Sequence, residues 1–85
     1  MIKVTVGNNV NRSAVIIDEN TTLRACLEAN NIDFARGSMN LDGSSLNAGD
    51  LNKTFKELGY DGTAGHDKCY LLNMVKTDNA VRVIL

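Results

Sequence analysis

The residues that could do covalent chemistry lie together in His66-Asp67-Lys68-Cys69, where the single histidine stands three positions before a cysteine. A histidine that accepts the thiol proton would activate the cysteine as a nucleophile. This segment leads into an apolar run that predicts a strand, and residues three apart in a strand face opposite sides of a sheet. We therefore expect His66 to lie in a loop and Cys69 to point into the core, and we expect no catalytic residues.

A metal site could use the same loop, in which His66, Asp67 and Asp61 could gather. Three ligands without a fourth are weak support for a zinc site. The alternating acids of a calcium loop are missing around Asp61. The adjacent carboxylates Asp18 and Glu19 are most simply a solvated approach to a helix, where negative charge favours the helix dipole. We expect neither a metal nor another cofactor.

The composition is typical of an ordinary soluble domain, with 44% hydrophobic and 22% charged residues in a chain of 85. Nine basic and ten acidic residues give a net charge of -1, without the clustered Lys and Arg that nucleic acid or an anionic membrane requires. No signal peptide and no membrane-spanning run is apparent, so we expect a cytoplasmic protein. Cys26 and Cys69 lie far apart, outside any CxxC pattern, and predict buried free thiols.

The first half of the chain predicts a hairpin followed by a helix. Ile2, Val4 and Val6 alternate with polar residues, which is typical of a half-buried strand. Residues 7–11 have turn chemistry and residues 13–18 predict a second, antiparallel strand. Residues 23–29 then predict a short amphipathic helix that begins after three N-cap candidates, Asn20, Thr21 and Thr22.

The second half predicts shorter elements around one long strand. Residues 39–41 predict a short strand, residues 42–45 a turn, and residues 51–58 a short helix with Asp50 as its N-cap and Gly59 just after its end. Residues 69–75 are apolar at nearly every position, which favours a central strand covered on both faces. Residues 80–85 predict a last strand.

The order of these motifs resembles that of the ubiquitin-like family over about residues 1–76. The resemblance is carried by Leu41-Asp42-Gly43-Ser44-Ser45-Leu46, then Asp50-Leu51 and Leu58-Gly59-Tyr60, then Cys69-Tyr70-Leu71-Leu72. It implies an α+β fold of the β-grasp type, in which a mixed sheet is crossed by one helix and followed by a short second helix. We expect residues 1–85 to form one such domain, with residues 77–85 as an added C-terminal strand.

Function does not follow from this fold, because one scaffold hosts many activities. Carriers and modifiers of the ubiquitin-like family need a flexible C-terminal Gly-Gly, whereas this chain ends in Val83-Ile84-Leu85. We therefore expect a chain that is not competent for conjugation. Ferredoxins of this fold need four cysteine ligands, and two cysteines exclude them.

The apolar run of residues 80–85 supplies a mechanism for binding. It could pair along an exposed sheet edge of a protein partner or of a second copy, with Val81, Val83 and Leu85 docking on one face and Tyr70 as a further surface anchor. Alternatively, it could complete the sheet of its own domain. We predict a non-enzymatic protein–protein interaction module.

Three other functions stay open at this stage. Small size and an Asn-rich, Pro-free composition also fit an inhibitor or regulator, encoded by a phage or mobile element, that binds a host enzyme. An enzyme acting through Cys69 and His66 and an atypical carrier are the remaining alternatives. The aromatic residues are few and imply no stacking platform for bases.

Overall fold

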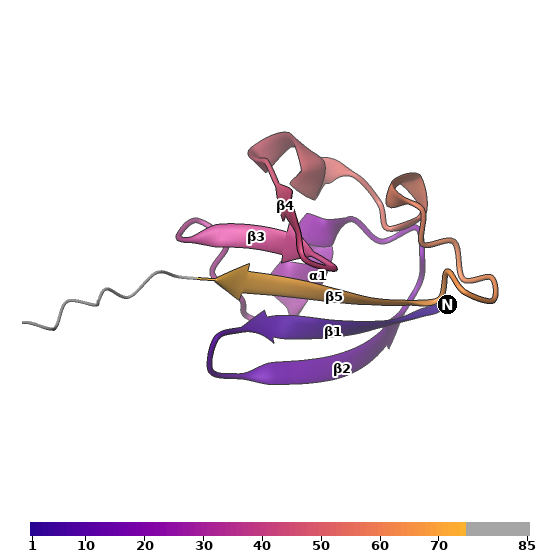
Figure 1. The fold of residues 1–85 in the computed structure, drawn as a ribbon, viewed down its shortest axis with the longest axis horizontal. Coiled ribbons are helices and arrows are strands. Elements are labelled where there is room, and N and C mark those ends of the chain that lie inside the picture. Colours follow the sequence, from indigo (N-terminus) through magenta and orange to yellow (C-terminus); the bar gives the residue numbers. More distant parts are fainter. Residues whose placement is uncertain (75–85) are drawn as a thin grey trace, which may run out of the picture.

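The computed structural model describes residues 1–74. Within them the chain is α+β, with a mixed sheet of five strands, one α-helix and two short 3-10 helices (Figure 1). The expectation of a mixed α+β sheet is confirmed, and the arrangement is compatible with a β-grasp-like fold. The predictions for residues 77–85, including the contacts of Val81, Val83 and Leu85, lie outside the described residues.

The last strand of the described chain occupies the centre of the sheet. The elements in chain order are β1 (Ile2–Asn8), β2 (Arg12–Ile17), α1 (Leu23–Ala29), β3 (Ser38–Leu41), β4 (Ser44–Leu46), η1 (Ala48–Asn52), η2 (Lys56–Leu58) and β5 (Lys68–Met74). The strand order is β2-β1-β5-β3-β4. The pair β1 and β5 is parallel, and the other three pairs are antiparallel.

The predicted hairpin of β1 and β2 is confirmed, and asparagine chemistry closes its turn. The Asn8 side chain accepts hydrogen bonds at 2.9 Å from the backbone N–H groups of Val10 and Asn11. The Asn8 backbone N–H also donates to the Asn11 carbonyl at 2.9 Å. β1 extends to Asn8, two residues beyond the predicted strand, because Gly7 and Asn8 pair with Leu72 and Asn73 of β5.

The predicted helix α1 is also confirmed, together with its N-cap. The Thr22 hydroxyl accepts a hydrogen bond from the Ala25 backbone N–H at 3.1 Å, which satisfies one of the donors left open at a helix start. Leu23, Cys26 and Leu27 form the buried face of the helix. They pack with apolar side chains of β1, β3 and β5 and with Phe55, so α1 covers one face of the sheet.

The predicted helix over residues 51–58 is wrong, because two 3-10 helices separated by an extended segment replace it. Asn47, and not Asp50, caps η1, and Asp50 completes the capping box. The intervening residues pair with the start of α1: the Lys53 carbonyl accepts from Leu23, and the Phe55 N–H donates to Thr21. These long-range bonds use backbone groups that a continuous helix would need for itself.

Two further predictions about the sheet are corrected. Residues 42–45 are more than a turn, because Ser44 and Ser45 enter β4 after a two-residue loop in which Asp42 and Gly43 both have positive φ. β5 is central, as predicted, but it is not covered on both faces within residues 1–74. Its side chains alternate, with Cys69, Leu71 and Asn73 buried and Tyr70 exposed.

Candidate functional site

His66 and Cys69 do not form a nucleophilic pair in this geometry. Cys69 faces the core, as predicted, and is only 3% exposed. Burial, together with the nearby charge of Asp42, raises the pKa of the Cys69 thiol to about 12. His66 lies exposed in the loop before β5, where its backbone bonds to Gly62 and Thr63. A thiol in this environment carries almost no thiolate at neutral pH.

The acidic loop residues are engaged in local structure. Within residues 1–74, no group of three or more His, Cys, Asp or Glu side chains gathers as a metal site would require. The Asp61 carboxylate accepts hydrogen bonds from the Thr63 hydroxyl at 2.6 Å and from the Thr63 backbone N–H at 3.0 Å. These bonds stabilise the charged form and lower the pKa of Asp61.

The strongest candidate is the face of the sheet opposite α1, here called the open face. Strand alternation and register assign to it Lys3 and Thr5 of β1, Arg12, Ala14 and Ile16 of β2, Asn40 of β3, and Lys68, Tyr70, Leu72 and Met74 of β5. Several of its apolar side chains are in contact with solvent: Ile16 is 62% exposed, Tyr70 53% and Met74 38%. An apolar stripe therefore runs along the central strand.

Tyr70 stands in the middle of this face. Thr5 of β1 pairs with it, and Ala14 of β2 is the next residue across the sheet. Both neighbours have small side chains, so they do not cover the aromatic ring, which projects from the sheet. Tyrosine offers a large apolar area and a polar hydroxyl, which is the combination that is enriched in protein interfaces.

The backbone of Tyr70 is fixed from the β3–β4 turn. The Asp42 carboxylate accepts a hydrogen bond from the Tyr70 N–H at 2.8 Å, and the Asp42 N–H donates to the Tyr70 carbonyl at 2.9 Å. The Tyr60 hydroxyl donates to the other oxygen of the same carboxylate. Burial and this bond raise the pKa of Tyr60 well above its ordinary value. Asp42 therefore locks the strand that carries the exposed ring.

The charged residues of the open face are all basic. Lys3 pairs with Lys68 across β1 and β5, and Arg12 begins β2 at the other end of the face. The strand residues assigned to the open face include no Asp or Glu. Since the whole chain has a net charge of -1, this basic border is a local feature that favours acidic groups on a partner.

Sequence reasoning found part of this face. It singled out Tyr70 as a surface anchor, and Tyr70 is exposed, whereas Tyr60 packs against the core. It missed Ile16, Met74 and the role of Asp42. A period of two in residues 68–74 would have indicated the face, but the polar Asn73 is buried and the apolar Leu72 is on the opposite side, so the pattern is obscured.

None of the helices within residues 1–74 is long and apolar enough to cross a membrane.

Comparisons with known proteins identify no relative of this chain. No family model matches the chain, and no curated protein or solved structure matches it.

Proposed function

We propose that this chain is a non-enzymatic protein-binding module of ubiquitin-like β-grasp fold, and that it binds its partner through the open face. The strand order β2-β1-β5-β3-β4, with β1 parallel to β5 and one helix across the sheet, supports the β-grasp assignment. The observation that carries the binding proposal is the exposure of Tyr70 on the central strand. Stable monomers rarely leave contiguous apolar surface on a sheet face without use.

Tyr70 has the properties of an interface anchor. An aromatic side chain buries roughly 150–250 Å² when it is fully covered, so covering the exposed half of Tyr70 removes on the order of 100 Å² from water. At about 25 cal/mol per Å² this contributes roughly 2–3 kcal/mol. The hydrogen bonds to Asp42 already hold the backbone, so only the two χ angles of the ring are left to be ordered on binding.

The chemistry of the partner follows from the border of the face. Apolar Tyr70, Leu72 and Met74 fit an apolar patch, whereas Lys3 and Lys68 fit acidic side chains around it. Rim charges mainly raise the rate of association, and salt weakens that effect. The expected partner is therefore a protein with an apolar patch bordered by Asp or Glu. Contacts through Val81, Val83 and Leu85 stay a prediction beside this one.

A crosslinking experiment tests the proposal. A photoreactive phenylalanine analogue replaces Tyr70 in the full chain, and the same analogue replaces exposed Glu28 on α1 as the matched control. Irradiation in cells of the native host should give a discrete adduct from position 70 and none of that mass from position 28. An adduct of twice the chain mass would identify a second copy as the partner, and a host enzyme would favour the inhibitor alternative.

The affinity of the captured partner then decides the role of the side chain. Tyr70→Ala should weaken binding by roughly 30-fold, which corresponds to the loss of about 2 kcal/mol. Glu28→Ala should leave the affinity unchanged, and circular dichroism should show that both variants are folded. Equal affinity of Tyr70→Ala and the unchanged chain would refute the open face as the binding surface.

A further inference from the structure

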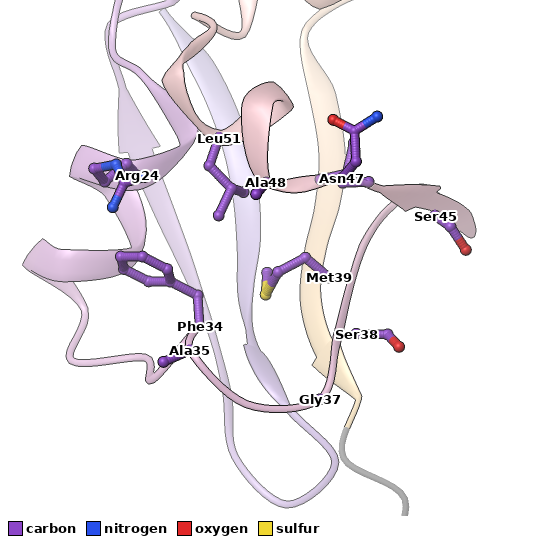
Figure 2. A pocket seen from close by; sticks show the side chains of 11 residues that line it. Arg24, Phe34, Ala35, Gly37, Ser38, Met39, Ser45, Asn47, Ala48 and Leu51 are labelled. Atoms are coloured by element: carbon purple, nitrogen blue, oxygen red, sulfur yellow. The ribbon is translucent and has the colours of Figure 1, made fainter.

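A pocket lies between α1, the loop after it, β3, β4 and η1. The loop after α1, β3, the end of β4 and η1 surround a cavity of about 470 Å³ (Figure 2). This volume falls within the range of roughly 300–1,000 Å³ that is typical of small-molecule sites. The binding proposal above does not use this pocket, so the two can be tested separately.

One wall of the pocket is apolar, and Ser38, Ser45 and Asn47 add polar groups to the lining. Figure 2 shows the side chains of Phe34, Met39 and Leu51 converging on one space from three different segments. Met39 and Leu51 belong to the buried core, so the wall that they form is rigid. Ala48 and Ala35 contribute only methyl groups to the lining, and larger side chains at these positions would fill the space.

One oriented cation stands at the edge of this apolar space. The Arg24 guanidinium carbon lies 5.1 Å from the centre of the Phe34 ring, and Arg24 Nε donates to Asn52 Oδ1 at 3.1 Å. Both contacts fix the plane of the guanidinium. Its Nη1 and Nη2 atoms carry the remaining N–H donors, and no hydrogen bond joins them to another residue within 1–74. These N–H groups can donate two parallel hydrogen bonds to an anion.

No carboxylate opposes this cation within the lining, where Arg24 is the one charged residue. Two acids, Asp33 and Asp50, are adjacent in sequence to lining residues, and each carboxylate makes contacts of its own. Asp50 accepts from the Asn47 N–H at 3.1 Å and pairs with Lys53 at 3.2 Å. Asp33 accepts from the Ala35 N–H at 3.0 Å. The Arg24 guanidinium is therefore the one charge within the pocket lining, and Asp33 and Asp50 lie outside that lining.

We infer that this pocket binds a small organic carboxylate, with the carboxylate on Arg24 and an apolar body against Phe34, Met39 and Leu51. An apolar wall beside a few fixed polar groups is a usual design of a small-molecule site. The guanidinium recognises the planar carboxylate, and the apolar body of the ligand takes the place of water over the core.

Titration of the full ¹⁵N-labelled chain with octanoate tests the inference, and octanol serves as the neutral analogue. Octanoate should give saturable shifts in the amide signals of Phe34, Ala35, Met39 and Ala48. It should bind at least about fivefold more tightly than octanol, because only octanoate can pair with Arg24. Shifts that do not saturate, or that centre on the open face, would overturn the inference, and so would equal affinities for the two probes.

Four variants test the charge and the free space of the pocket. Arg24→Gln should weaken octanoate binding about fivefold and leave octanol binding unchanged, whereas Arg24→Lys should retain most of the preference for octanoate. Ala48→Leu should abolish binding of both probes by filling the cavity. Arg12→Gln makes the same charge change on the open face and should leave the affinity for octanoate unchanged. Unchanged octanoate affinity in a folded Arg24→Gln would refute the proposed carboxylate contact.

Discussion

Gly7 lies in β1 at a point where the backbone of the β1–β2 hairpin comes very close. A Cβ added there would stand 2.1 Å from the Asn11 carbonyl oxygen and 2.7 Å from the Arg12 Cα. Real Cβ atoms essentially never come within 3.0 Å of such a neighbour, so the Asn11 carbonyl must retreat by at least 0.9 Å, the difference between 3.0 and 2.1 Å. The same carbonyl accepts the hydrogen bond from Asn8 that closes the hairpin.

The expected cost of Gly7→Ala follows from these contacts. Overpacking against rigid surroundings costs about 1–3 kcal/mol, and the strained Asn8 bond adds roughly 0.5–1.5 kcal/mol. Restricting the unfolded chain returns about 0.4–1 kcal/mol. At the centre of these ranges the net loss in the free energy of unfolding is about 2 kcal/mol. In a domain of this size a loss of about 2 kcal/mol lowers the melting temperature by roughly 8–16 °C.

Two other glycines provide matched controls for the same substitution. Gly49 in η1 has no neighbour closer than 3.6 Å to an added Cβ, so Gly49→Ala should be neutral or stabilise the protein by about 0.5 kcal/mol. Gly43 has open space but a φ of +86° in the β3–β4 turn, so Gly43→Ala should cost about 1 kcal/mol through backbone strain.

Urea unfolding followed by far-UV circular dichroism measures all three variants. The denaturation midpoints should fall in the order Gly49→Ala, Gly43→Ala, Gly7→Ala, with similar m-values. A Gly7→Ala protein as stable as Gly43→Ala would show that the hairpin backbone does not press on Gly7, and the reasoning from close approach would be refuted.

Three further predictions concern buried or capping groups. Asn73→Asp should cost about 3 kcal/mol at neutral pH, because a carboxylate would face the Arg36 carbonyl that the Asn73 amide now donates to at 2.7 Å. The loss should shrink as the pH falls towards about 4, because the buried acid takes up its proton above its ordinary pKa and can then donate; a loss independent of pH would contradict this. Iodoacetamide at pH 8 should alkylate Cys69 about 1,000-fold more slowly in the folded chain than in urea, because the folded pKa of about 12 lies above the ordinary value of 9.0. The same shift should make stability fall as the pH rises above about 9, since the unfolded chain loses its proton first, and rapid alkylation of folded Cys69 would contradict its burial. Asn47→Ala should cost about 1 kcal/mol through loss of the η1 cap, whereas Asn47→Asp keeps an acceptor and should be nearly neutral in thermal melts; equal melting temperatures for the two variants would argue against the cap.

Local signals in the sequence predicted the elements that local interactions determine. The alternation of Ile2, Val4 and Val6 predicted β1, and the Thr22 cap predicted the start of α1, because the physical causes act within a few residues. Gly59 ends η2 with a φ of 103°, which also agrees with its predicted role just after a helix.

Long-range pairing explains the elements that sequence reasoning missed. Lys53 is extended, with φ -88° and ψ 153°, and its carbonyl accepts from the Leu23 N–H, although the local pattern favours a helix there. Leu72 and Asn73 also depart from the local pattern, because the apolar Leu72 is on the open face and the polar Asn73 is buried. Asn73 is buried because its amide reaches Arg36, 37 positions earlier in the chain, and no local pattern reports such a partner.

The sequence by itself determined the chemistry that this chain offers: a hairpin and helix with a small apolar core, two isolated thiols, and a tyrosine on a central strand. Only the tertiary structure decided which of those side chains meet. Asp42 reaches Tyr70, and Arg24 reaches Asn52, each across 28 positions of sequence. The physical reason is that periodicity and capping act over a few residues. The face that a strand leaves uncovered, and the space between a loop and a sheet, depend instead on how distant segments pack.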